Sequence, residues 1–166
     1  MIFTLSQIKE ASKAIAPAFK FDPALIVGIA KQECMRDKDG NFDASVTRLE
    51  QNFYQNYIAK KMNLATTSEA LLACSFGVWQ LMGLSLWELK FFDNPLAAIA
   101  PRLDAFCVDL NLQCEYACRH LATKRDIANK MASFKGETNK EKMMLLLWNS
   151  GGAPNYANEV LAKKEI

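Results

Sequence analysis

Apolar residues recur at helical spacing along almost the whole chain. A first helix is predicted from about residue 5 to residue 19, with one apolar face made by Leu5, Ile8, Ile15 and Phe19. A second helix should begin where Asp22 can cap it and Pro23 can occupy its first position. This helix runs through ALIVGIAKQEC, and its apolar surface predicts burial on most sides.

Breaker-rich RDKDGN should end that helix, and a further helix is predicted over RLEQNFYQNYIAKKM, before the polar turn NLATTS. Two pairs have the spacing of a capping box, in which a hydroxyl and a glutamate cap a helix start: Thr66 with Glu69, and Thr138 with Glu141.

Prolines mark two later elements. Asn94 and Pro95 begin a helical stretch that Pro101 should kink or divide, and a short helix from Ala153 to Lys164 has Pro154 near its start. No pair of alternating runs joined by a tight turn indicates a large sheet. With 166 residues, of which 51% are apolar, we expect one mainly α domain over residues 1–166.

Charge and cysteine content narrow the class of protein. Twenty basic residues against 18 acidic ones are scattered without a basic stripe, which argues against nucleic-acid binding. No segment is long enough to cross a bilayer, and the N-terminus lacks the apolar centre of a signal peptide. Five cysteines, an odd number in mostly apolar stretches, indicate reduced core thiols and synthesis in a reducing cytosol.

Several kinds of chemistry are excluded by missing residues. His120 is the only histidine, so a two-histidine zinc motif is impossible. Cys114, Cys118 and His120 lack paired C-x-x-C spacing and are interpreted as buried thiols and a half-exposed histidine. No glycine-rich phosphate loop is present. We therefore expect neither a metal nor an organic cofactor.

Glu33 is the first candidate for chemistry, because it ends the apolar helix. The helix dipole and an apolar core both disfavour a negative charge there, so we expect the pKa of Glu33 to be raised. A raised pKa suits a general acid that protonates a glycosidic oxygen. The alternative is a solvated glutamate at a helix end.

A second candidate is the segment from Ser75 to Gly83, SFGVWQLMG. Gly77 permits close backbone approach, Ser75 and Gln80 offer hydrogen-bonding groups, and Trp79 has a flat ring of the kind that stacks on sugars. The alternative is a core segment with a turn at each end.

The third candidate is Trp148-Asn149-Ser150-Gly151-Gly152 with the downstream Tyr156. A helix that enters a glycine turn with an asparagine before it fits ordinary C-capping. The same geometry can present Asn149 to a cleft.

In this order, the three segments resemble the superfamily of soluble lytic transglycosylases and goose-type lysozymes. With RLEQNFY before FGVWQLMG, the chain more closely resembles the N-acetylmuramidase domain of phage endolysins. The resemblance runs from about Asp22 to Leu161 and implies a lysozyme-like fold with a groove between two lobes. It departs from the family in Cys34, where serine is common after the catalytic glutamate, and in Phe76 and Trp148, which replace tryptophan and tyrosine.

The resemblance implies a monomeric peptidoglycan hydrolase that cleaves between N-acetylmuramic acid and N-acetylglucosamine. Glu33 is then the catalytic acid and Glu50 the second glutamate. The implied substrate-binding residues are Ser75, Gly77, Trp79, Gln80, Trp148, Asn149 and Tyr156. Without an export signal, such an enzyme reaches the wall by lysis, through a pore or on a phage particle.

Other interpretations remain open. A hydrolase can use a second carboxylate, Asp43 or Glu50, to hold water, whereas a lytic transglycosylase needs only one acid. Glu50 could instead be the partner of Arg48 in a surface ion pair. A non-catalytic wall-binding or phage structural domain is the third possibility.

Overall fold

The computed structural model describes residues 1–34, 36–62, 67–93 and 99–164. It is mainly helical, as predicted. Among the described residues, no helix combines the length and apolar character needed to cross a bilayer. The chain forms two compact units, each made of two segments. Unit 1 comprises Met1–Gln7 and Glu33–Gln113, and unit 2 comprises Ile8–Gln32 and Cys114–Ile166.

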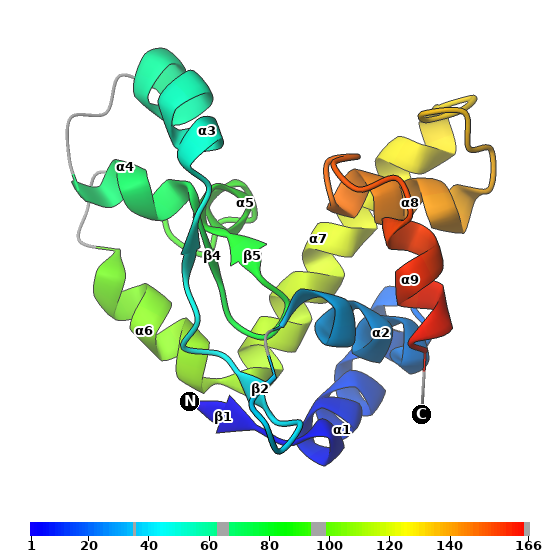
Figure 1. Ribbon diagram of the computed structural model, residues 1–166, viewed down its shortest axis with the longest axis horizontal. Helices are drawn as coiled ribbons and strands as arrows, with labels where there is room; N and C mark the ends of the chain where they lie inside the picture. The colour runs from blue at the N-terminus through cyan, green and yellow to red at the C-terminus, as the bar shows by residue number, and fades with distance from the viewer. Residues whose placement is uncertain (35, 63–66, 94–98, 165–166) are drawn as a thin grey trace. The chain divides into compact units, whose positions relative to one another are not determined.

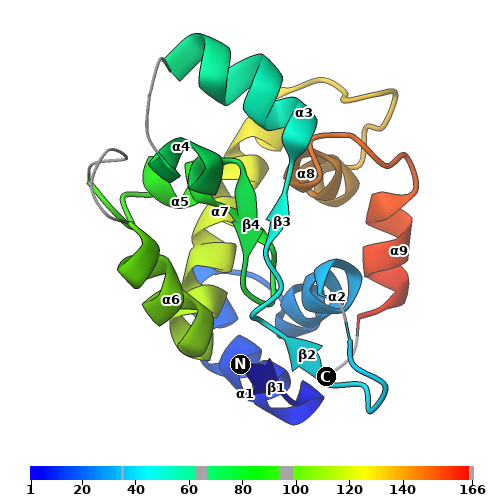
Figure 2. The ribbon, with the colours of Figure 1, turned by 60° about the vertical axis from the view of Figure 1, so that its left-hand side comes forward.

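Unit 1 holds two small antiparallel sheets. Strand β1 (Ile2–Phe3) pairs with β2 (Phe42–Asp43), and β3 (Arg48–Leu49), β4 (Cys74–Phe76) and β5 (Leu81–Met82) form a three-stranded sheet in the order β3-β4-β5. Figure 2 shows β3 and β4 side by side, with Arg48 opposite Ser75. The helix predicted from residue 48 was therefore wrong at its start, because Arg48 and Leu49 pair with a strand distant in the sequence.

Helices surround this sheet within unit 1. The segment after β3 forms α3 (Gln51–Phe53) and a π-helix, η2 (Tyr54–Met62), which is followed by α4 (Thr67–Leu72), α5 (Gly83–Glu88) and α6 (Ala100–Val108). Helix α4 contacts η2, α5 and β4 (Figure 1). Pro101 lies in the first turn of α6, a position that proline favours. Thr66, Asn94 and Pro95 lie outside the described residues, so the helix starts predicted there are not described.

The described residues of unit 2 form α-helices and one 3-10 helix. These are most of α1 (Leu5–Ile15), η1 (Ala16–Phe19), α2 (Pro23–Glu33) up to Gln32, α7 (Leu110–Lys130) from Cys114 onward, α8 (Lys140–Trp148) and α9 (Tyr156–Ala162). The helix predicted to reach residue 19 changes at Ala16 into the 3-10 turn η1, where Pro17 lies in the first turn.

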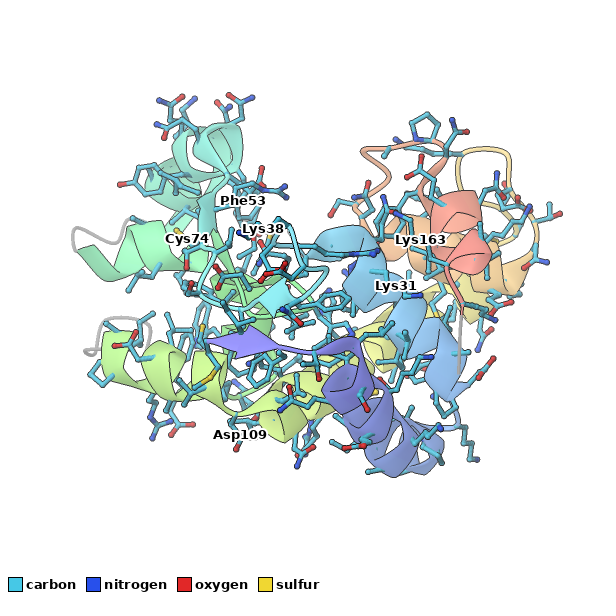
Figure 3. All side chains as sticks on the ribbon, turned by 60° about the horizontal axis from the view of Figure 1, so that its bottom comes forward. Lys31, Lys38, Phe53, Cys74, Asp109 and Lys163 are labelled. Atoms are coloured by element: carbon cyan, nitrogen blue, oxygen red, sulfur yellow. The ribbon has the colours of Figure 1, made fainter. Side chains whose placement is uncertain are left out.

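Close packing joins three helices of unit 2. In Figure 1, α9 lies beside both α8 and α2. A Cβ on Gly28 would lie 2.7 Å from the Val160 carbonyl oxygen, so α2 and α9 approach at backbone distance. Polar side chains link the same two helices, because Gln32 donates to Glu159 (2.7 Å) and Lys163, labelled in Figure 3, donates to Gln32 (2.5 Å).

Helix caps follow the local sequence in part. The Asp22 carboxylate accepts the Ala24 N–H at 2.9 Å, so the predicted start of α2 is confirmed. At α8 the capping residue is Asn139 rather than Thr138, because the Asn139 side chain accepts the N–H groups of Glu141 and Lys142. The capping box predicted from Thr138 was therefore wrong by one residue.

Candidate active site

Helix α2 carries Glu33 as its last residue. Every residue of α2 from Ala24 to Lys31 is buried, whereas Glu33 is half-buried. The final turn of a helix exposes carbonyl oxygens whose partial negative charge disfavours a nearby carboxylate. The raised pKa expected for Glu33 from its sequence remains a prediction.

The next residue, Cys34, fixes the chain that leaves α2. Its buried thiol donates to the Asp43 carbonyl oxygen at 3.6 Å. Burial raises the pKa of Cys34 to about 11, so the group remains a thiol near neutral pH. The residue after Glu33 is thus attached to the end of β2.

A short turn connects the hydrogen bond between Cys34 and Asp43 to the β4-β5 hairpin. The Val46 N–H donates to the Asp43 carbonyl oxygen (3.4 Å), which closes a turn whose end Cα atoms lie within about 7 Å of each other. The Gln80 side-chain amide donates to the Val46 carbonyl oxygen at 3.1 Å. Cys34 and Gln80 therefore bind opposite ends of one turn, which brings two of the predicted motifs to the same place in unit 1.

The hairpin itself is held tightly. Gly77 and Gln80 both have positive φ, of 74° and 47°, and Gln80 N–H closes the turn onto the Gly77 carbonyl at 3.2 Å. A Cβ on Gly77 would lie 2.5 Å from the Gln113 side-chain oxygen, which accepts the Val78 N–H at 2.8 Å. Only glycine fits this position without displacing Gln113.

Two other residues of this segment are buried. Trp79 is 1% exposed and Ser75 is 2% exposed, and the Ser75 hydroxyl donates to the Arg48 carbonyl oxygen at 3.4 Å. In this structure the Trp79 ring belongs to the core of unit 1, and its predicted stacking on a sugar would need the ring to become exposed.

Glu50 follows β3. Its N–H donates to the Ala73 carbonyl oxygen (3.0 Å), and its carboxylate pairs with the Arg48 Nε at 2.7 Å. The two side chains are 40% and 66% exposed, so this is a surface ion pair worth at most about 1 kcal/mol. A direct contact therefore supports the interpretation of Glu50 as the ion-pair partner of Arg48. A role of Glu50 in binding water remains a prediction.

Asp43 is the other candidate for a second carboxylate. Its side chain accepts hydrogen bonds from the Ser45 hydroxyl (2.5 Å) and the Ser45 N–H (2.9 Å). These bonds lower the pKa of Asp43, so this carboxylate is ionised near neutral pH. The main-chain carbonyl oxygen of Asp43 accepts the Cys34 thiol, so this carboxylate lies at the start of the turn described above.

The sequence interpretation missed an aromatic pair beyond Glu50. The rings of Phe53 and Tyr57 stack with their centroids 5.1 Å apart and an interplanar angle of 15°. Tyr57 is 40% exposed, and the amide side chains of Asn52 and Asn56 are exposed on the neighbouring positions (Figure 3 labels Phe53). Aromatic faces and neutral amides suit sugar rings. The i, i+4 spacing of the two aromatics was the available signal.

The remaining predicted site residues, Trp148, Asn149 and Tyr156, belong to unit 2. Asn149 is the C-cap residue of α8, and its side-chain oxygen accepts the Ala153 N–H at 2.8 Å. Trp148 is half-buried with its ring edge-on to His120, and Tyr156, the first residue of α9, is 2% exposed. Asn149 thus has the capping role, which leaves its predicted role at a cleft untested.

The residues weighed as metal ligands lie on α7. Cys114 and Cys118 are buried, and a hydrogen bond between their thiols, together with burial, raises the pKa of Cys118. Burial lowers the pKa of His120 to about 3, and its exposure of 9% is less than the half exposure expected. In the described part of the chain, no three histidine, cysteine or acidic side chains form a group suited to a metal.

Comparison of the chain with protein-family models, curated proteins and solved structures finds no match.

Proposed function

We propose that this chain is a peptidoglycan hydrolase that cleaves the β-1,4 bond between N-acetylmuramic acid and N-acetylglucosamine. The observation that carries the proposal is the turn from Asp43 to Val46, which binds the residue after Glu33 at one end and Gln80 at the other. A half-buried acid at a helix end beside a glycine-bearing hairpin fits general acid catalysis. The motif resemblance supports the same assignment.

The proposed chemistry starts with proton transfer. Glu33 gives its proton to the glycosidic oxygen as the bond to the leaving sugar breaks, and positive charge develops on the remaining sugar ring. An ionised carboxylate then stabilises that charge, or holds the attacking water and takes up the proton that the water loses as it bonds to the sugar. Asp43 and Glu50 are the two candidates, and the hydrogen bonds from Ser45 favour the ionised form of Asp43.

The proposal includes a lysozyme-like fold, a single domain with a substrate groove between two lobes. Trp148, Asn149 and Tyr156 would then line the wall of the groove opposite Glu33. A crystal structure with a bound glycan fragment tests this, because contacts of the sugar with Glu33 but not with Asn149 would refute the groove.

A lytic transglycosylase is the second candidate. The specific observation in its favour is the ion pair that engages Glu50, because a transglycosylase uses the sugar's own 6-hydroxyl and needs no second carboxylate. A non-catalytic wall-binding or phage structural domain would retain the same fold without cleavage. For either enzyme we propose release to the wall by lysis, through a pore or on a phage particle.

Digestion of purified cell walls tests the assignment. Glu33→Gln should retain the fold and lose at least about a hundredfold in rate. Glu88→Gln is a matched control, because Glu88 is an exposed glutamate that also ends a helix, α5. Full activity of Glu33→Gln would refute the catalytic assignment.

Mass analysis of the products separates the alternatives. Reducing N-acetylmuramic acid ends support the hydrolase, whereas 1,6-anhydro ends support the transglycosylase. The absence of any product from the wild-type protein would favour the binding domain.

A further inference from the structure

Unit 2 contains a pocket whose chemistry the proposed hydrolysis does not use. It lies where the chain between η1 and α2 meets α7 and the first turns of α8, and it encloses about 260 Å³. This is the volume of roughly eight or nine water molecules, enough for a ligand the size of an amino acid.

The floor of the pocket is apolar and carries one fixed cation. Phe21, Leu25 and Met144 line it and are each at most 7% exposed. The Arg125 guanidinium carbon lies 4.6 Å from the centre of the Phe21 ring, and its Nη1 donates to the Phe19 carbonyl oxygen at 2.9 Å. Of the five N–H groups of a guanidinium, the other four have no acceptor among the described residues.

The charges around the pocket are unbalanced. Its two carboxylates, Asp22 and Glu141, are both paired with Lys164, at 3.7 Å and 2.9 Å. The Lys20 ammonium group makes no hydrogen bond or ion pair within the described part of the chain, and the Lys140 ammonium group donates only to main-chain carbonyl oxygens near the end of α7. The lining cations therefore lack carboxylate partners, and the pocket has an excess of positive charge.

We propose that this pocket binds a small ligand with one carboxylate or phosphate group and a short apolar part. The Arg125 fork matches the paired oxygens of either group, and Lys20 adds a second positive charge. The exposed side-chain amide of Asn129, which makes no hydrogen bond among the described residues, can donate to the same group. Phe21, Leu25 and Met144 contact the apolar part. The proposal does not rest on the proposed hydrolase activity.

Nuclear magnetic resonance of the full ¹⁵N-labelled chain tests the proposal. The probes are N-acetylalanine for a carboxylate, glycerol phosphate for a phosphate ester, and the neutral methyl amide of N-acetylalanine as a control ligand. We expect saturable shifts of the Arg125 Nε–H and Asn129 side-chain signals with at least one anion, and none with the neutral amide. Tighter binding of N-acetylalanine would identify the ligand group as a carboxylate, and tighter binding of glycerol phosphate would identify it as a phosphate ester.

Substitutions then locate the binding. Lys20→Gln should weaken binding about two- to fivefold, since Lys20 is exposed. Arg125→Gln should weaken it at least about tenfold. Lys130→Gln is the matched control, because Lys130 is an exposed cation on α7 that does not line the pocket, and it should leave binding unchanged.

Arg125 also packs on Phe21, so its replacement could unfold the chain. In that case Lys20→Gln and Asn129→Ala test the proposal, because neither side chain makes a hydrogen bond or ion pair among the described residues. No saturable shift with either anion, an equal response to the neutral amide, or unchanged binding in Lys20→Gln would overturn the proposal.

Discussion

Acidification should destabilise this protein through its single histidine. His120 is 9% exposed and packs edge-on against Trp148, with the ring centroids 5.1 Å apart. In the folded protein its imidazole is neutral. Burial, assisted by the nearby charge of Lys124, lowers its pKa from an ordinary 6.5 to about 3. In the unfolded chain the same imidazole binds a proton below about pH 6.5.

The size of the effect follows from the two pKa values. Because the unfolded state binds the proton and the folded state does not, the free energy of unfolding falls as the pH falls through 6.5 and continues to fall down to about pH 3. The slope approaches 1.4 kcal/mol per pH unit for one proton, so the loss between about pH 7 and about pH 5 is about 2 kcal/mol. The lowered pKa of Asp43 places its titration below this range.

Urea unfolding of the wild-type protein and of His120→Phe across this pH range measures the effect. The phenylalanine keeps a ring against Trp148 but cannot bind a proton, so its stability should lack the decrease of about 2 kcal/mol. The two imidazole C–H signals of His120 in the folded protein should show no titration near pH 6.5. Equal pH dependence of both proteins, or an imidazole that titrates near 6.5 while folded, would refute the burial argument.

Three further predictions concern a tight backbone contact and the proposed site. Gly83→Ala should lower the free energy of unfolding by about 1–3 kcal/mol in thermal unfolding, because its Cβ would lie 2.2 Å from a main-chain carbonyl oxygen of α4. Gly152→Ala should lower it less, because the nearest atoms to its Cβ would be 3.4 Å away. If the chain cleaves glycans, Tyr57→Ala should raise KM about three- to tenfold with kcat unchanged and Tyr57→Phe should behave as wild type; an unchanged KM in Tyr57→Ala would exclude the ring from binding. Asp43→Asn should lower kcat more than Glu50→Gln does, and the reverse order in steady-state assays would assign the second carboxylate to Glu50.

Local signals in the sequence were enough to predict the elements whose ends are determined by adjacent residues. Helix α2 begins at Pro23 because Asp22 caps it, and it ends at Glu33, so the proposed acid could be located without coordinates. Asn149 at the end of α8 is the same kind of case, since its capping role follows from the glycines after it.

Contacts between distant segments could not be predicted in this way. Arg48 and Leu49 form β3 only because β4 pairs with them, and a helical pattern over the following residues conceals that pairing. Trp79 is buried because unit 1 packs around it, whereas its sequence neighbours left both an exposed ring and a core position open. The turn that joins Cys34 to Gln80 depends on two hydrogen bonds across 9 and 34 residues, for which the sequence carries no local signal.

The way the two units divide the chain limits how the protein can be cut or recombined. Each unit consists of two separated segments, and the chain passes between units after Gln7, after Gln32 and after Gln113. No single cleavage therefore separates the chain into one fragment for each unit. Removing only the first seven residues would take β1 away from β2, together with the hydrogen bond from the Ala44 N–H to the Met1 carbonyl oxygen. Exchange of either unit between proteins would have to transfer both of its segments at once.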